Sequence, residues 1–160
     1  MPDSLEVTFR RSYARLVASL TLVGGREAAE DAVQEAFVRA STRWWRIQHY
    51  DKPEAWIRRV AINKIVSTLR VDGRVDSLEQ PIADDTSNAS TSSESGMDVR
   101  AALCSLSSRQ RLFLVLQHVE QMKVREIAEV AGVAEGTVKS GLSDGRKRML
   151  DMLGAGYEVG

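Results

Sequence analysis

The sequence predicts an all-α protein made of two small helical domains joined by a flexible acidic linker. Apolar residues recur at three- and four-residue spacing in two separate halves, and no segment shows strand-like alternation. A stretch rich in Ser, Thr and Asp and without Lys or Arg separates these halves. We therefore expect domains at residues 1–75 and 99–155, with the linker at residues 76–98.

The N-terminal half reads as three helices. The first has its apolar face on Phe9, Tyr13, Leu16, Val17 and Leu20 and stops at Gly24-Gly25. The second has a stripe of small and apolar residues, and the third begins at Pro53, a residue suited to the first helical position, and runs towards Leu69. The second stripe consists of Ala29, Ala32, Val33, Ala36, Phe37 and Ala40.

The formal net charge of zero hides an uneven distribution along the chain. Residues 1–75 carry 13 Lys and Arg against 9 Asp and Glu, residues 76–99 carry none against 6, and residues 100–160 carry 9 against 7. Two mildly basic blocks on an acidic tether are compatible with two modules that face nucleic acid. A long loop inside one domain is the alternative for residues 76–98, but structureless loops of that length are uncommon in compact domains.

The C-terminal half reads as four helices that end in a helix-turn-helix. The first of these helices begins near Met97, and Ser107-Ser108 can cap the second. The last two are indicated by aliphatic residues around Gly132, a glycine able to take a positive φ in the turn. The second helix of this motif would begin at about Ala134 and present its first residues to DNA.

Composition excludes several classes of protein and site. Cys104 is the only cysteine and His49 and His118 the only histidines, so neither a disulfide framework, a metal site nor a bound cofactor is expected. No apolar run is long enough for membrane insertion and the N-terminus lacks the plan of a signal peptide, so we expect a cytoplasmic protein. A small hydrolase using Asp84-Asp85 is disfavoured because no histidine or phosphate-binding loop accompanies that pair, and no enzyme is expected.

Four segments in order resemble bacterial sigma factors of the extracytoplasmic-function type. Residues 25–40 (GREAAEDAVQEAFVRA) are similar to the helix that docks on the clamp of RNA polymerase, and residues 53–63 (PEAWIRRVAIN) to the helix that helps open the minus-ten element. Residues 106–111 (LSSRQR), with VREIAE at 124–129 and GTVKS at 136–140, are similar to the domain that reads the minus-thirty-five element. The resemblance implies a transcription initiation factor that binds core RNA polymerase and promoter DNA and is held inactive by an anti-sigma factor.

The resemblance also implies three sets of functional residues. The core-polymerase set is Glu30, Asp31, Gln34, Glu35 and Arg39. The downstream-promoter set is Gln48, His49, Tyr50, Arg58, Arg59, Asn63 and Lys64, where a loop at residues 46–52 mixes aromatic and basic side chains as single-stranded DNA binding requires. The upstream-promoter set is Glu135, Thr137, Lys139, Ser140, Arg146 and Lys147.

Simpler readings of the same residues stay open at this stage. The acidic face can be an ordinary solvated helix surface, Trp56 and Cys104 can be core residues, and Asn63 can stabilise the surface of its helix. A helix-turn-helix repressor or activator that never touches polymerase is the rival function. Such a regulator would need neither the face from Glu30 to Arg39 nor the aromatic and basic loop.

One segment departs from the family pattern. After its Thr-Val-Lys-Ser the family usually continues with an arginine, whereas this chain has GLSDG at residues 141–145. Each glycine inside a helix costs roughly 1 kcal/mol relative to alanine, and the missing arginine removes a phosphate contact. We therefore expect position 141 to face the phosphates, the recognition helix to be weakened there, and Gly141→Arg to strengthen DNA binding.

Overall fold

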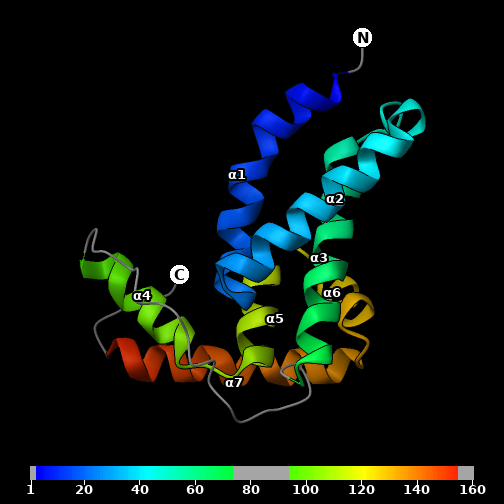
Figure 1. Cartoon of the computed structure of the whole chain (residues 1–160). Helices are drawn as coiled ribbons and strands as arrows, with labels where there is room; N and C mark the ends of the chain where they lie inside the picture. The colour runs from blue at the N-terminus through cyan, green and yellow to red at the C-terminus, as the bar shows by residue number, and fades with distance from the viewer. Residues whose placement is uncertain (1–2, 74–93, 155–160) are drawn as a thin grey trace. The chain divides into compact units, whose positions relative to one another are not determined.

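The computed structural model describes residues 3–73 and 94–154, which form seven helices and no strand (Figure 1). They divide into two compact units on either side of the bond between Leu69 and Arg70. The prediction of an all-α chain with two helical domains is confirmed for these residues. Residues 76–93 of the expected linker lie outside the described residues, so the linker stays a prediction.

The first unit contains three helices, α1 (Leu5–Gly24), α2 (Arg26–Ile47) and α3 (Pro53–Val71). Gly25 ends α1 and caps the start of α2 with a φ of 92°, a backbone conformation that side chains disfavour. Its N–H donates to the carbonyl of Thr21 at 3.0 Å, and its carbonyl accepts from Ala29 at 3.0 Å. One residue therefore joins the two helices, and α1 and α2 pack along each other (Figure 1).

Small side chains line the buried side of α2. Ala29, Ala32, Ala36 and Ala40 are all fully buried, which confirms the predicted stripe and lets neighbouring helices approach closely. The buried side of α1 combines small polar and aliphatic residues, namely Thr8, Ser12, Leu16, Ser19, Leu20 and Val23. Because the alanines of α2 must face the neighbouring helices, the rotation of α2 about its axis is set, and its polar residues point outward.

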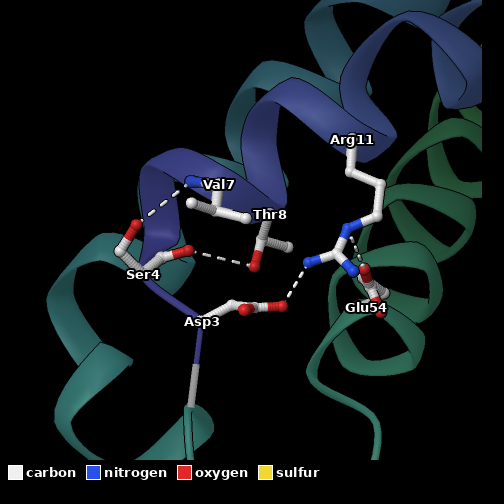
Figure 2. Close-up of polar contacts among 6 residues, drawn as sticks. All are labelled: Asp3, Ser4, Val7, Thr8, Arg11 and Glu54. Atoms are coloured by element: carbon white, nitrogen blue, oxygen red, sulfur yellow. Dashed lines mark hydrogen bonds and ion pairs between the residues drawn. The ribbon is translucent and has the colours of Figure 1, made fainter. Parts of the chain in front are cut away.

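An ion-pair clip links the start of α1 to the start of α3 (Figure 2). Ser4 caps α1 by accepting the N–H of Val7 at 3.2 Å, and the Thr8 hydroxyl donates to the Ser4 carbonyl at 3.1 Å. Arg11 pairs with Asp3 and, through Nε, with Glu54 Oε2 at 3.2 Å. The hydrogen bond that Arg11 donates to the Asp3 carboxylate, followed by the negative charge of Glu54, raises the pKa of Arg11.

The second unit contains α4 (Glu94–Cys104), α5 (Ser108–His118), α6 (Val124–Ala131) and α7 (Glu135–Leu153), and α4, α5 and α6 all pack on α7 (Figure 1). Helix α4 begins at Glu94 rather than near Met97, so the last residues assigned to the linker are helical. Ser107 caps α5 as predicted, because its hydroxyl accepts the N–H of Gln110 at 3.1 Å.

The predicted helix-turn-helix is formed by α6 and α7. Gly132 ends α6 in the left-handed conformation, with φ 71° and ψ 36°, and its N–H donates to the carbonyl of Ala128 at 2.8 Å. Ile127, Ala131 and Val138 are buried where the two helices meet. The turn therefore requires a left-handed backbone conformation at Gly132, as the glycine at this position predicted.

The expectation for Gly141 is wrong. Helix α7 runs without interruption through Gly141 and Gly145, and both glycines face α5 rather than solvent. A Cβ atom at Gly141 would lie 2.7 and 2.9 Å from two ring carbons of Phe113, and one at Gly145 would lie 3.1 Å from Leu114 Cδ1. The helix-propensity cost is thus offset by the close packing that these glycines allow between α5 and α7.

Several other residues differ from the predicted core, and Tyr13 and Val17 of the expected apolar face of α1 are only half-buried. Phe9 is 41% exposed although it lies on the expected apolar face of α1, because it stacks on Tyr13 and meets the edge of Phe37 at the rim of the unit. Trp56 and Cys104 are half-buried rather than fully enclosed. The aromatic rings at this rim belong to the surface described below.

We predict that Gly141→Ala destabilises the second unit. Overpacking against the buried Phe113 ring costs about 1–3 kcal/mol, and the gain in helix propensity returns at most about 1 kcal/mol. Gly141→Arg is expected to cost more and to weaken DNA binding instead of strengthening it. Urea unfolding followed by circular dichroism measures both free energies of unfolding.

Gly136→Ala is the matched control, since an added Cβ at this position of the same helix meets nothing within 4 Å. It should leave the free energy of unfolding unchanged or raise it. Phe113→Leu combined with Gly141→Ala should cost less than the sum of the two single changes. The packing role of Gly141 would be contradicted if Gly136→Ala and Gly141→Ala changed the free energy of unfolding equally and if the effects of Phe113→Leu and Gly141→Ala were additive.

Candidate functional site

The acidic face of α2 points outward because its opposite side carries the buried alanines. Asp31, Gln34 and Arg39 are exposed, while Glu30 and Glu35 are half-buried. Ion pairs join Arg26 to Glu30 at 3.2 Å and Arg39 to Glu35 at 2.7 Å. Asp31 takes part in no ion pair within the described residues, so it presents an unneutralised carboxylate. The structure therefore brings all five residues of the core-polymerase set onto one helix.

Apolar and aromatic groups border this acidic face. The Gln34 amide donates to the Tyr13 hydroxyl at 3.1 Å, which connects the face to the cluster of Phe9, Tyr13 and Phe37. Val38 is 64% exposed and follows Gln34 by one helical turn. Exposed apolar groups beside charged ones are typical of a protein-binding surface. Val38 was outside the predicted set, although its four-residue spacing from Gln34 on the polar side could have indicated it.

The turn after α2 carries the first part of the downstream-promoter set. Gln48, His49 and Tyr50 are held by backbone hydrogen bonds, of which the shortest joins the Tyr50 N–H to the Ile47 carbonyl at 2.9 Å. Arg46 and Ile47 belong to α2, so the connection spans residues 48–52 rather than the expected 46–52. Pro53 follows at once and starts α3, whose first turn is fixed by the clip from Arg11 to Glu54 (Figure 2).

An exposed tryptophan lies just before this turn. Trp45 is 70% exposed, and the Arg46 guanidinium carbon lies 5.8 Å from the centre of its ring. Arg43 leaves helical geometry, with φ −126° and ψ 15°, so α2 bends immediately before this pair. A ring face with a cation beside it can stack an unpaired base. Trp45 was outside the predicted set, although its place in a basic and aromatic stretch was a signal for it.

Helix α3 spreads the other downstream residues over different sides. Asn63 is exposed, and Arg59 and Lys64 are half-buried. Arg58 is also half-buried but precedes the buried Ala61 and Ile62 by three and four residues, so it lies on the inward side of α3. Lys64 Nζ pairs with Glu35 Oε1 at 3.3 Å, which links this set to the acidic face.

The start and middle of α7 present the upstream-promoter set. Glu135, Lys139, Ser140, Arg146 and Lys147 are exposed, and Thr137 is half-buried. Lys139 and Arg146 are seven residues apart, as are Ser140 and Lys147, so two rows run along the outer side of the helix. These rows lie away from Gly141 and Gly145, which face α5.

Arg146 also influences the end of α5. Its guanidinium donates to the Gln117 side-chain oxygen, and its charge adds to partial burial in lowering the pKa of His118. Arg146 is therefore already oriented by α5 before any phosphate is bound.

The described residues contain no group of three His, Cys, Asp or Glu side chains that could hold a metal ion. Asp84 and Asp85, the pair weighed for a hydrolase, lie outside the described residues. None of the described helices is long and apolar enough to cross a membrane. The predicted binding residues that the structure describes lie on α2, in the turn after it, on α3 and on α7.

Two family models match the chain, one in each unit. Residues 9–75 match sigma-70 region 2, and residues 96–149 match sigma-70 region 4. The first match covers the acidic face and the aromatic turn, and the second covers the helix-turn-helix. A lone helix-turn-helix regulator has no reason to carry region 2, so the rival function loses its support.

Curated relatives match over most of the chain. The RNA polymerase sigma-E factor of Streptomyces coelicolor is 32% identical over 147 residues, which cover 89% of this chain and 81% of that protein. The ECF RNA polymerase sigma factor SigM of Mycobacterium tuberculosis is 31% identical over 152 residues, covering 91% and 75%. SigE of Mycolicibacterium smegmatis is 31% identical over 142 residues, and the match spans 82% of this chain but only 54% of that longer relative.

A solved structure has a similar fold. It is the sigma factor RpoE of Bartonella quintana in complex with the anti-sigma factor NepR, with a TM-score of 0.62 and 25% identity over 92% of this chain and 95% of that one. Regions 2 and 4 therefore occur here in the order and with the helical architecture of known sigma factors. The chain belongs to the extracytoplasmic-function sigma factors, and it is a transcription initiation factor of the sigma-70 family.

Proposed function

We propose that the chain binds core RNA polymerase through the outward face of α2 and directs it to promoters through two DNA-binding surfaces. The turn at residues 48–52 and the outer side of α3 open and read the minus-ten element, and α7 reads the minus-thirty-five element. What carries this proposal is the pairing of an outward acidic and apolar face with an exposed aromatic and basic turn in region 2, followed by a helix-turn-helix in region 4.

The docking role rests on the mixture of groups on α2. Asp31 supplies an unneutralised carboxylate for a cation on polymerase, and Val38 supplies apolar area about two turns further along. Charges at such an interface fix orientation and partner choice, while buried apolar groups supply most of the affinity. Gln34 and Arg39 extend the polar part of the same face.

The promoter-opening role rests on exposed rings beside cations. Tyr50 and Trp45 can stack unpaired bases, and Arg46 and Arg59 can follow the phosphates of a single strand. The chemistry of RNA synthesis belongs to polymerase, so we assign no catalytic residue to this chain. We place the protein in the cytoplasm, where its polymerase partner acts.

An anti-sigma factor is a further proposed partner. The solved relative is a complex of a sigma factor with the anti-sigma factor NepR. A protein that covers the face of α2 would block docking at the point where Asp31 and Val38 are exposed. We therefore expect the anti-sigma factor and polymerase to exclude each other from this face.

We predict that Asp31→Arg weakens binding of core polymerase by about tenfold or more without changing helical content. Asp31 is the cleaner target than Glu35, because Glu35 also neutralises two cations within the chain. A titration of labelled protein with core polymerase measures the affinity, and far-ultraviolet circular dichroism measures the helix.

Glu6→Lys is the control, since Glu6 is an exposed carboxylate on α1 outside the proposed face. It makes a comparable change in charge and should leave the affinity for polymerase unchanged. If Asp31→Arg binds polymerase as tightly as Glu6→Lys does, α2 does not dock in the proposed way.

We predict that Lys139→Gln and Lys147→Gln each make the salt dependence of duplex binding shallower. Every phosphate contact contributes about 0.9 to the slope of log affinity against log salt, so each variant should lose roughly that amount. A salt series of fluorescence anisotropy on a mixed-sequence duplex measures these slopes. Arg100→Gln removes an exposed cation from α4 and should leave the slope unchanged. If all three variants had the same slope, Lys139 and Lys147 would not contact DNA phosphates and the assignment of the outer rows of α7 would be wrong.

A further inference from the structure

One carboxylate connects the polymerase face to the promoter face. Glu35 on α2 uses both of its oxygens, because Oε2 pairs with Arg39 at 2.7 Å and Oε1 pairs with Lys64 Nζ of α3 at 3.3 Å. The Glu35 and Lys64 side chains are 31% and 38% exposed, so an incoming partner can reach either of them. Glu35 belongs to the proposed docking surface and Lys64 to the proposed DNA surface. In the free chain these two side chains form an ion pair with each other.

This pairing weakens both surfaces in the absence of partners. The Lys64 charge is neutralised by a carboxylate 3.3 Å away, which reduces its attraction for a phosphate. Glu35 is likewise saturated by two cations and offers little to a cation on polymerase. Because the pair is partly exposed rather than buried, breaking it is inexpensive and lies within reach of binding energy.

We propose that the ion pair between Glu35 and Lys64 couples polymerase docking to single-stranded DNA binding. A polymerase cation that takes Glu35 releases Lys64 to a phosphate of the opened strand, and a strand that takes Lys64 releases Glu35 to polymerase. Each partner raises the affinity of the other by the same factor, as linkage requires. The inference rests on the proposed function, because it assigns Glu35 and Lys64 to those two surfaces.

The strength of a partly exposed ion pair sets the size of the coupling. Measured pairs of this kind correspond to a change of about two- to fivefold in an equilibrium constant. The pair therefore biases the free chain against DNA without preventing binding. The rival interpretation is a clamp that only holds α2 against α3, in which case breaking the pair lowers stability and leaves DNA affinity unchanged.

The test uses the free full-length chain, so that polymerase contacts of Glu35 play no part. A short fluorescein-labelled oligothymidylate is the probe, and its anisotropy is followed in a salt series. Glu35→Gln should bind the probe about two- to fivefold more tightly than the unchanged chain at low salt. Its slope of log affinity against log salt should steepen by up to about 0.7, the contribution of one phosphate contact in a single strand.

Two further variants separate release of Lys64 from a general change in charge. Glu6→Gln removes one negative charge and breaks the ion pair with Arg10 on α1, so it is the matched control and should produce no such gain. In the Lys64→Gln background, Glu35→Gln should bind the probe no more tightly than Lys64→Gln alone. Unfolding in urea, measured on the same variants, shows whether the loss of the pair acts on stability instead.

The coupling is overturned if Glu35→Gln binds no more tightly than Glu6→Gln, or if its gain persists without Lys64. Tyr50→Ala in the same assay separates this failure from failure of the proposed function. Weaker binding by Tyr50→Ala, together with no gain for Glu35→Gln, rejects the coupling alone. Unchanged binding by both variants rejects the downstream DNA surface itself.

Discussion

Close approach of helices at small residues is the constraint on which both units depend. In the first unit the fully buried alanines of α2 let neighbouring helices pack against it, and in the second Gly141 and Gly145 admit Phe113 and Leu114 of α5. A helix held along a row of small residues cannot rotate without burying polar groups or opening voids. The acidic face of α2 and the basic rows of α7 are therefore oriented by the residues on their opposite sides.

The same constraint determines which groups of α2 remain on its surface. The buried alanines occupy the inward side of α2, and the larger groups Val38, Trp45 and Tyr50 on or just after this helix are exposed to partners. The turns that join the helices are short. Gly25 ends α1 and begins α2, and Gly132 ends α6. Two ion pairs connect α3 to its neighbours near the proposed binding surfaces. One joins Arg11 to Glu54 (Figure 2), and the other joins Lys64 to Glu35.

Sequence alone predicted the helices and the helix-turn-helix, because periodicity, caps and Gly132 are local signals. It failed at Gly141, since helix propensity records a local cost and gives no information on the ring of Phe113 that fills the space. It placed Phe9 in the core, because spacing identifies a face but not how far that face is covered. The pair of Glu35 with Lys64 is a tertiary contact between two helices, so no spacing rule could indicate that the two predicted surfaces meet there.

The central claim is that the oriented faces of α2, α3 and α7 make this chain a promoter-directing subunit of RNA polymerase. The most direct measurement is run-off transcription by core polymerase on a pool of genomic promoters, with permanganate mapping of unpaired thymines. The account predicts discrete transcripts that require the chain, with reactive thymines just upstream of each start. Transcripts and thymine reactivity that are the same with and without the chain would contradict it.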